Sequence, residues 1–140
     1  MGTGTSVGIP SLGALGWGKC DPLNPKNRRQ RCSVVIQDNE TNILIDAGPD
    51  IRNQLLENNI NKIDALLITH DHSDHISGLD ELRPFYFTNR MKLNLYTHKT
   101  TAKLIKKRFN YLFEKQSNSQ SYFQPPLFIN EIEYYDFVKI

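Results

Sequence analysis

The sequence predicts an α/β fold, and two observations support this prediction. The segment Ile63–Thr69 is a continuous apolar stretch of strand length, which is typical of a strand covered on both faces in an α/β sheet. Segments with the apolar spacing of amphipathic helices lie on either side of it. The chain has 140 residues, enough for one domain with a single core.

The elements expected before this strand are a loop, a hairpin and a helix. Residues 1–18 are rich in glycine, which predicts turns rather than a regular element. We expect strands at Cys32–Gln37 and Asn42–Asp46, with the polar residues between them forming a hairpin turn. A proline suits the first turn of the helix that we expect over Pro49–Asn58. The apolar face of that helix would consist of Ile51, Leu55 and Leu56.

The elements expected after this strand alternate again between helix and strand. In order they are a helix over Ser77–Leu82 that ends before Pro84, a strand at Lys92–Thr97, an amphipathic helix over Thr100–Glu114, a polar stretch at Gln116–Gln124, and one or two strands within Phe128–Ile140. The longer helix would bury Leu104, Ile105, Phe109, Leu112 and Phe113.

Composition excludes several classes of protein. The net charge is only +2, with 17 basic and 15 acidic side chains, so nothing global demands a nucleic acid or an anionic membrane as partner. Two cysteines are too few for a disulfide framework, and Cys32 at the start of a strand is expected to be buried. The sequence shows no signal peptide and no stretch of about 18 apolar residues, so we expect a cytoplasmic protein.

The residues that can carry chemistry follow the apolar strand directly. His70, His72 and His75 lie within six residues together with Asp71 and Asp74, at a strand end, where ligand sites gather in α/β sheets. Two histidines two residues apart can aim their imidazoles at one divalent ion, and the following aspartate and histidine can serve a second ion. Two such ions can share a bridging hydroxide that attacks an ester or phosphodiester. The alternative is a solvated histidine-rich loop that binds metal adventitiously.

A family resemblance rests on these residues and on three further segments. ITHDHSDHISGLDELR resembles the signature motif of the metallo-β-lactamase superfamily. GTGTSVGIP, RRQRCSVVI and ILIDAGPDIRNQLL are similar to the branch that contains the phosphoribosyl cyclic phosphodiesterases and, more distantly, ribonuclease Z. The resemblance implies an αββα sandwich with two zinc or manganese ions, with His70 and His72 on the first ion and Asp74 and His75 on the second. Asp71 would not be a primary ligand.

The resemblance also implies roles for residues around the loop of residues 70–75, which we call the metal loop. Asp46 would support and orient that loop, although it could instead cap a turn or the following helix. The glycine-rich loop at Gly2–Gly8 would border the site and contact phosphate, although glycines alone indicate only tight turns.

The chain departs from the family pattern in its ligand set. The family uses a third histidine on the first ion, a bridging aspartate and a late histidine on the second ion. After His75 the sequence has only His98, at a position where the family places no ligand. We therefore expect residues 1–140 to form a partial metallo-β-lactamase-like domain, the first half of the sandwich, which lacks the first strand and the C-terminal half. The alternative is a minimal complete domain.

The function expected from the sequence is a metal-dependent hydrolase of phosphodiesters, with Asp74 as a catalytic residue as well as a ligand. The basic cluster Lys26, Arg28, Arg29 and Arg31 could hold a small phosphodiester substrate or could be a solvated turn. A second basic set is expected as a solvated helix face, with an RNA-binding surface as the alternative that no other feature supports: Lys103, Lys106, Lys107 and Arg108. An acyl substrate, as in thioesterases or lactamases, is the enzymatic alternative. The other alternative is an inactive metal-binding fragment, or half of a split enzyme that joins a complementing C-terminal half. Among partners, a homo-oligomer is possible and no membrane is expected.

Overall fold

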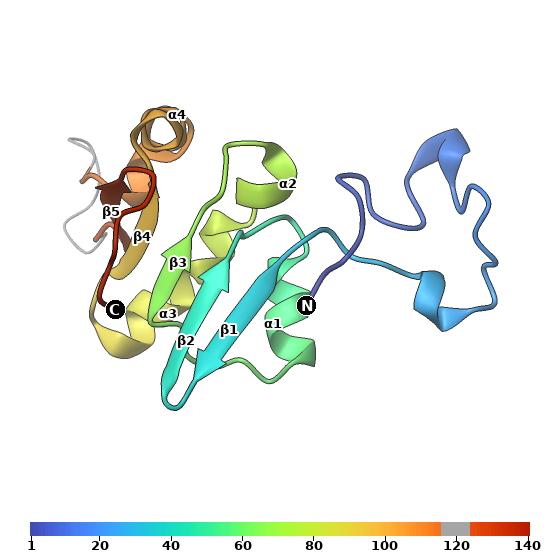
Figure 1. The fold of residues 1–140 in the computed structure, drawn as a ribbon, viewed down its shortest axis with the longest axis horizontal. Coiled ribbons are helices and arrows are strands. Elements are labelled where there is room, and N and C mark those ends of the chain that lie inside the picture. Colours follow the sequence, from blue (N-terminus) through green and yellow to red (C-terminus); the bar gives the residue numbers. More distant parts are fainter. Residues whose placement is uncertain (116–123) are drawn as a thin grey trace.

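A computed structural model describes residues 1–115 and 124–140, and its strands form one five-stranded sheet in the order β1-β2-β3-β4-β5. The strands are β1 (Val34–Asp38), β2 (Thr41–Ile45), β3 (Ala65–Leu67), β4 (Leu93–His98) and β5 (Leu127–Ile132). β1 and β2 form the expected antiparallel hairpin, whereas β2, β3, β4 and β5 pair in parallel (Figure 1). Parallel pairing requires crossover connections, and the segments between these strands contain the helices.

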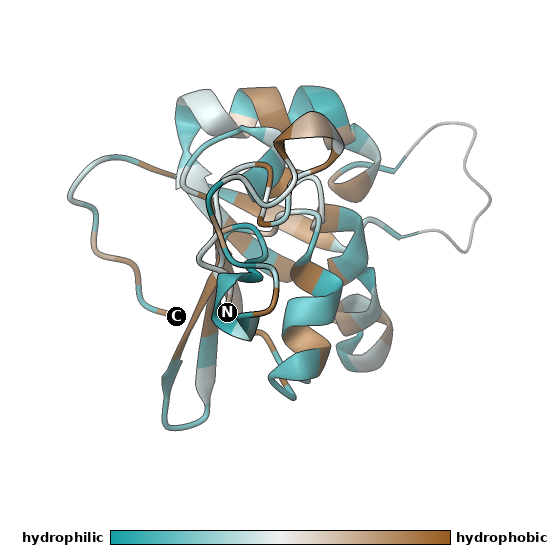
Figure 2. Cartoon of the chain, turned by 90° about the vertical axis from the view of Figure 1, so that its right-hand side faces the viewer, coloured by the Kyte–Doolittle hydropathy of each residue, from teal (hydrophilic) through white to brown (hydrophobic). Residues whose placement is uncertain are grey.

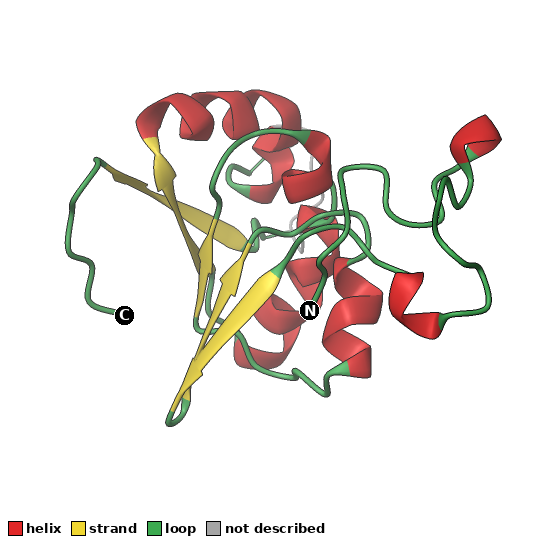
Figure 3. Ribbon diagram, turned by 45° about the vertical axis from the view of Figure 1, so that its right-hand side comes forward, coloured by secondary structure: helices red, strands yellow, loops and turns green. Residues whose placement is uncertain are grey.

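The helices lie to one side of the sheet, while the segment after β5 runs on the other side (Figure 3). They are α1 (Ile51–Glu57), α2 (Ser73–Ile76), α3 (Arg83–Asn89) and α4 (Lys99–Phe109), with short 3₁₀ turns at Gly13–Leu15, Pro25–Asn27, Leu79–Leu82 and Asn110–Leu112. None of the helices in the described ranges is long and apolar enough to cross a membrane.

The core lies between the helices and one face of the sheet. Leu44, Leu66 and Leu95 occupy neighbouring positions in the strand register and are fully buried. They pack in one apolar cluster with residues of the helices, including Ile51 and Ile105. Figure 2 shows that the strands are largely hydrophobic, whereas the hairpin turn is hydrophilic. Burial of this single face therefore holds the layers together.

The opposite face of the sheet carries several partly exposed apolar side chains together with polar ones such as Asn94. Val34, Ile36 and Phe128 on this face are 44%, 49% and 53% exposed, respectively. Leu67 of β3 lies in the same register row as Val34 and is half-buried. The expected coverage of β3 on both faces is thus found only in part, because the helices all cover the other face. We call this the outer face of the sheet.

Two expected helix faces are wrong in detail. In α1 the buried residues are Ile51, Gln54 and Leu55, whereas Leu56 is 61% exposed. Gln54 takes the inner position because its side-chain amide donates to the backbone oxygen of Arg31 at 2.8 Å, which satisfies a buried donor. The long expected helix ends at Phe109 and continues only as a 3₁₀ turn, and its Leu104 is 43% exposed.

Other boundaries also differ from expectation. Pro84 lies in the first turn of α3, where the N–H that a proline lacks would have no partner within the helix. The chain before it forms a 3₁₀ turn instead of an α-helix. Cys32 is exposed because the strand alternation turns its neighbour Ser33 inward. After Pro126 a single strand forms, in agreement with the expected one or two, and the polar stretch expected at Gln116–Gln124 falls almost wholly outside the described residues.

An arm formed by residues 10–28 extends away from the sheet (Figure 1). It contains two 3₁₀ turns and is stabilised locally, for example by the Arg28 guanidinium, which lies 5.2 Å from the ring centre of Trp17. The glycine loop before it joins the body through short bridges between Gly2 and Ser33 and between Gly4 and Arg31.

Candidate metal centre

The expected metal residues gather at one edge of the sheet because β2 and β3 are parallel. Asp46 follows the last residue of β2, and the loop Thr69–Ser73 follows β3. Carboxyl ends of parallel strands meet at the same edge, so these two segments become neighbours. The backbone N–H of Asp46 donates to the oxygen of Leu67 at 2.9 Å, which extends the pairing to this point.

Asp46 is a buried carboxylate that contacts both ends of the histidine loop. Its side chain is 6% exposed, and its Oδ1 accepts the backbone N–H of Thr69 at 2.8 Å. Its Oδ2 lies 2.7 Å from Nδ1 of His75 and accepts the Thr69 hydroxyl at 2.8 Å. The first residues of α1 receive no side-chain cap from it. The carboxylate therefore fixes the loop rather than capping the helix.

His75 is oriented by this contact. A proton on Nδ1 that is donated to Asp46 leaves a lone pair on Nε2, the arrangement found in carboxylate–histidine–metal triads. That Nε2 lies 3.2 Å from Oδ2 of Asp74. Both side chains come from the first turn of α2, which begins inside the motif. A nitrogen donor and an oxygen donor are thus placed side by side.

The other two histidines pack against His75. The ring centre of His70 lies 4.1 Å from that of His75 and 4.6 Å from that of His72. Nδ1 of His70 lies 3.0 Å from the hydroxyl of Thr69. The structure therefore brings all four expected ligand residues and Asp46 into one cluster.

The donor chemistry of this cluster fits a divalent cation, since neutral imidazole and carboxylate are the preferred ligands of zinc and manganese. Within residues 1–115 and 124–140, however, no three His, Cys, Asp or Glu side chains form a ready cage around one point. The donors approach one another in pairs.

Two glycines permit the close packing of α2 against the segment after β2. A Cβ at Gly78 would lie 2.1 Å from the backbone oxygen of Gly48, and a Cβ at Gly48 would lie 2.0 Å from that of Asp74. The N–H of Gly78 donates to the oxygen of Ala47, whose own N–H donates to the oxygen of His75. These contacts hold the end of the metal loop at a fixed distance from Asp46.

Arg108 contacts the middle of the metal loop, which sequence reasoning missed. Its Nη1 donates to the backbone oxygen of Asp71 at 2.5 Å, and its Nη2 lies 2.8 Å from Oδ2 of the same residue. The sequence predicts a solvent-exposed position for Arg108, and its side chain is about half exposed. No sequence signal links it to Asp71, because 37 residues separate them.

A cavity of about 280 Å³ lies beside Asp74. Its lining combines aliphatic side chains and hydroxyls with one arginine and one carboxylate: Ser6, Val7, Ser11, Leu12, Leu15, Arg31, Pro49, Ser73, Asp74 and Ser77. The glycine loop therefore borders the site through Ser6 and Val7. Of the basic cluster, Arg31 reaches this cavity, and its Nε lies 3.1 Å from the carboxylate of Asp50.

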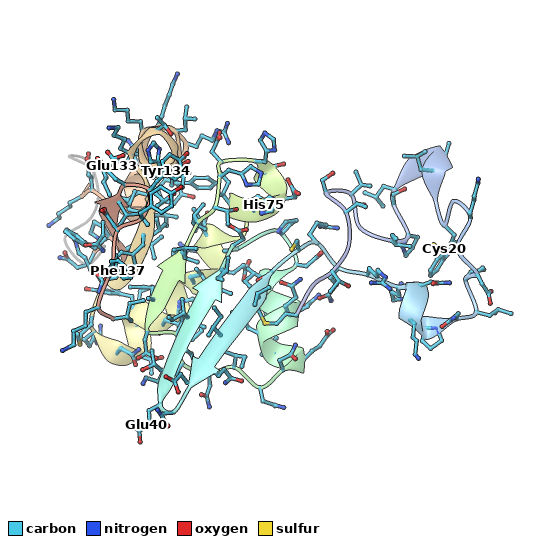
Figure 4. The ribbon with its side chains drawn as sticks, in the orientation of Figure 1. Cys20, Glu40, His75, Glu133, Tyr134 and Phe137 are labelled. Atoms are coloured by element: carbon cyan, nitrogen blue, oxygen red, sulfur yellow. The ribbon has the colours of Figure 1, made fainter. Side chains whose placement is uncertain are left out.

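The remaining candidate residues lie elsewhere. His98 at the end of β4 contacts Thr100 at 2.8 Å and stacks on Tyr134, with 4.8 Å between ring centres. Arg29 donates to the hydroxyl of Thr3 at 3.0 Å. Of the two cysteines, Cys20, which sequence reasoning gave no site role, lies on the arm, away from His75 (Figure 4).

Comparison with known proteins places this geometry in a family. A sequence model described as the beta-lactamase superfamily domain matches residues 41–134. The chain is 37% identical over 116 residues to an octanoyltransferase of Porphyromonas gingivalis and 43% identical over 62 residues to a ribonuclease Z of Agathobacter rectalis. These matches cover 82% and 43% of the chain, but only 23% and 20% of the two relatives.

Solved structures show the same fold. A diphosphatase of the PhnP family superposes with a TM-score of 0.80 and 33% identity, over 99% of this chain and 50% of that protein. Zn²⁺-bound PqqB of Methylobacterium extorquens shares the fold alone, with a TM-score of 0.59 and 24% identity over 76% of this chain and 41% of its own. The chain thus spans half or less of each of these proteins. The family match and the shared fold show that this chain belongs to the metallo-β-lactamase superfamily, as its HDHSDH motif predicted.

Proposed function

We propose that this chain provides metal ligands and substrate contacts for hydrolysis of a phosphodiester. The observation that carries the proposal is the placement of His75 between Asp46 and Asp74, next to a cavity that Arg31 lines. The relatives named above include a diphosphatase and a ribonuclease, both of which act on phosphate linkages by name.

Four residues would hold divalent ions, zinc or manganese, with His70 and His72 on one ion and Asp74 and His75 on a second. Divalent ions, when bound, supply an activated water and neutralise charge that develops on phosphorus. Asp46 would keep His75 in the tautomer that presents Nε2. Asp74 lines the cavity directly, so its carboxylate would both bind metal and accept a proton near the reacting atoms.

Arg31 is the proposed phosphate contact. A guanidinium can donate two parallel hydrogen bonds to phosphate oxygens, and the Arg31 guanidinium forms an ion pair with Asp50 at 3.1 Å. The aliphatic side chains Val7, Leu12 and Leu15 would contact the organic part of the substrate. This combination favours a small organic phosphodiester over a long nucleic acid.

Hydrolysis of bis-p-nitrophenyl phosphate, compared with an octanoyl thioester, tests the proposal. We expect the purified chain with Zn²⁺ or Mn²⁺ to release p-nitrophenolate, and the whole PhnP-family diphosphatase serves as the positive control. His72→Ala and Asp74→Ala should each abolish metal-dependent release, whereas the matched exposed change Asp38→Ala should not. Faster turnover of the thioester would favour an acyl substrate, in line with the name of the octanoyltransferase relative, and would contradict the phosphodiester proposal.

A second candidate function is one half of a two-part enzyme, and the outer face of the sheet favours it. Val34 and Ile36 at one edge of this face and Phe128 at the other are partly exposed apolar side chains, which would suit a face that another layer covers. The proposed occupant is the part of the PhnP-family fold that this chain does not span, which would also supply any further metal ligands.

Co-expression with that second half of the PhnP-family diphosphatase would test this candidate. We expect a 1:1 complex by analytical ultracentrifugation and more hydrolysis than the chain shows alone. Ile36→Asp on the outer face should weaken the complex, whereas Gln37→Asp on the same strand should not. A stable dimer of the chain by itself would instead favour a second copy as the occupant.

A further inference from the structure

The loop that carries His70 and His72 is fixed at three points. At its start, Asp46 accepts the N–H and hydroxyl of Thr69. At its end, the oxygen of His75 accepts the N–H of Ala47 at 2.8 Å. At its middle, Arg108 of α4 contacts Asp71. The third point is the one that lies between the two imidazoles.

Arg108 contacts Asp71 at two places, the backbone oxygen and the side-chain carboxylate. Nη1 donates to the backbone oxygen of Asp71 at 2.5 Å, which restrains the peptide leading into His72. Nη2 lies 2.8 Å from the carboxylate oxygen Oδ2, which holds the Asp71 side chain against α4. A planar guanidinium can make both contacts at once, whereas a single ammonium cannot hold this fork.

The position of Asp71 explains why this restraint matters. In an extended loop successive side chains point to opposite sides, so His70 and His72 share one side and Asp71 takes the other. Rotation of the peptide at Asp71 would change the relative directions of the two imidazoles. The Asp71 side chain is only 22% exposed, in agreement with a fixed rather than a freely solvated residue.

We propose that Arg108 is a positioning residue for the metal centre, which holds Asp71 so that His70 and His72 can bind the same ion. The inference rests on the proposed function, because it requires these histidines to be metal ligands. Arg108 itself does not bind the ion. Its contribution is to reduce the reorganisation of the loop when metal binds, which raises the affinity.

Zinc affinity of the intact chain, measured by chelator competition, tests this inference. We expect Arg108→Ala to weaken zinc binding by about 10-fold, as for other residues that orient metal ligands. Lys107→Ala is the matched control, because it removes the same charge from an exposed neighbour on α4. Arg108→Lys should recover only part of the affinity. In the Asp71→Ala background, Arg108→Ala should still weaken zinc binding but by less than in the unmodified chain, because only the Nη1 contact with the backbone oxygen of residue 71 is left to lose.

Three further readouts separate positioning from a change in stability or in substrate contact. With Co²⁺ bound, the visible absorption spectrum should change in Arg108→Ala and stay unchanged in Lys107→Ala. In the metal-free chain, the amides of residues 70–72 should exchange hydrogen faster in Arg108→Ala alone. Inorganic phosphate binding should be equal in both variants, whereas a selective loss in Arg108→Ala would make Arg108 a substrate contact and overturn the inference.

The failure of the proposed function can be distinguished from the failure of this inference. If His72→Ala binds zinc as tightly as the unmodified chain, the assignment of the metal centre is wrong and the inference about Arg108 falls with it. If His72→Ala loses zinc but Arg108→Ala matches Lys107→Ala in affinity, spectrum and exchange, the metal centre stands and only the inference about Arg108 is overturned.

Discussion

The carboxylate oxygen Oδ2 of Asp46 lies 2.7 Å from Nδ1 of His75, so a buried residue after β2 orients an imidazole in α2. Replacement by asparagine keeps the size of the side chain and removes its charge. We expect Asp46→Asn to weaken zinc binding by about 10- to 100-fold, because the amide is a poorer partner for the imidazole N–H. Chelator competition measures this, with the exposed Asp38→Asn as the control of equal charge. Unchanged affinity in Asp46→Asn would show that His75 does not depend on this contact.

The close approach of α2 to the segment after β2 predicts a steric effect of adding one methyl group. Gly78→Ala should lower the free energy of unfolding by about 3 kcal/mol, because the new Cβ would overlap the backbone oxygen of Gly48. Gly13→Ala, where the added Cβ meets nothing within 4 Å but φ is +73°, should cost about 1 kcal/mol. Urea denaturation compares the two. Equal losses would indicate that packing at Gly78 is not the limiting factor.

The burial pattern of α1 predicts very different effects of two truncations in one helix. Ile51 is fully buried, so Ile51→Ala should lower the free energy of unfolding by about 2–5 kcal/mol. Leu56 is 61% exposed, and Leu56→Ala should change it by about 0.5 kcal/mol or less. Thermal and urea denaturation measure both. A large effect at Leu56 would support the helix face expected from the sequence instead of the observed one.

The raised pKa of Tyr111 predicts that the folded chain loses stability at alkaline pH. Burial and a hydrogen bond donated to Asp80 at 2.5 Å raise the pKa of Tyr111 to about 12. The folded state therefore retains this proton more strongly than the unfolded state, whose tyrosine pKa is about 10. The resulting stabilisation is complete below pH about 10 and is lost as the pH rises towards about 12.

Absorbance of tyrosinate at 295 nm measures this titration. The folded chain should show one late component that Tyr111→Phe removes and that the exposed control Tyr135→Phe retains. Denaturation in urea between pH 9 and 12 should show a steeper loss of stability in the unmodified chain than in Tyr111→Phe. A late component that persists in Tyr111→Phe would assign the high pKa to another tyrosine.

The hairpin, the central strand and the cluster at its end could be predicted from the sequence, because each rests on local pattern. Alternation and continuous apolar runs specify β1, β2 and β3, and the spacing of His70, His72 and Asp74 specifies the loop chemistry. Asp46 was accessible only through the family resemblance, since its partner His75 is 29 residues away.

The features that could not be predicted depend on tertiary contacts. Gln54 is buried because a carbonyl of the preceding loop accepts its amide, whereas periodicity alone favours Leu56. Arg108 and Lys107 are alike in sequence, and only the packing of α4 places Arg108 against Asp71. The exposure of the outer face could not be predicted either, because the hydropathy of a strand does not show whether another layer of the structure covers it.

The backbone of Asp46 has a φ of +60°, in the left-handed region that few residues other than glycine, asparagine and aspartate adopt at low cost. The same position requires a short carboxylate that reaches both Thr69 and His75. Among the twenty amino acids only aspartate meets both requirements. Every substitution of Asp46 is therefore expected to cost either the backbone conformation or the contact with His75. Asparagine or glycine would preserve the turn and lose the anionic partner of the imidazole, whereas glutamate would preserve the charge and strain the turn.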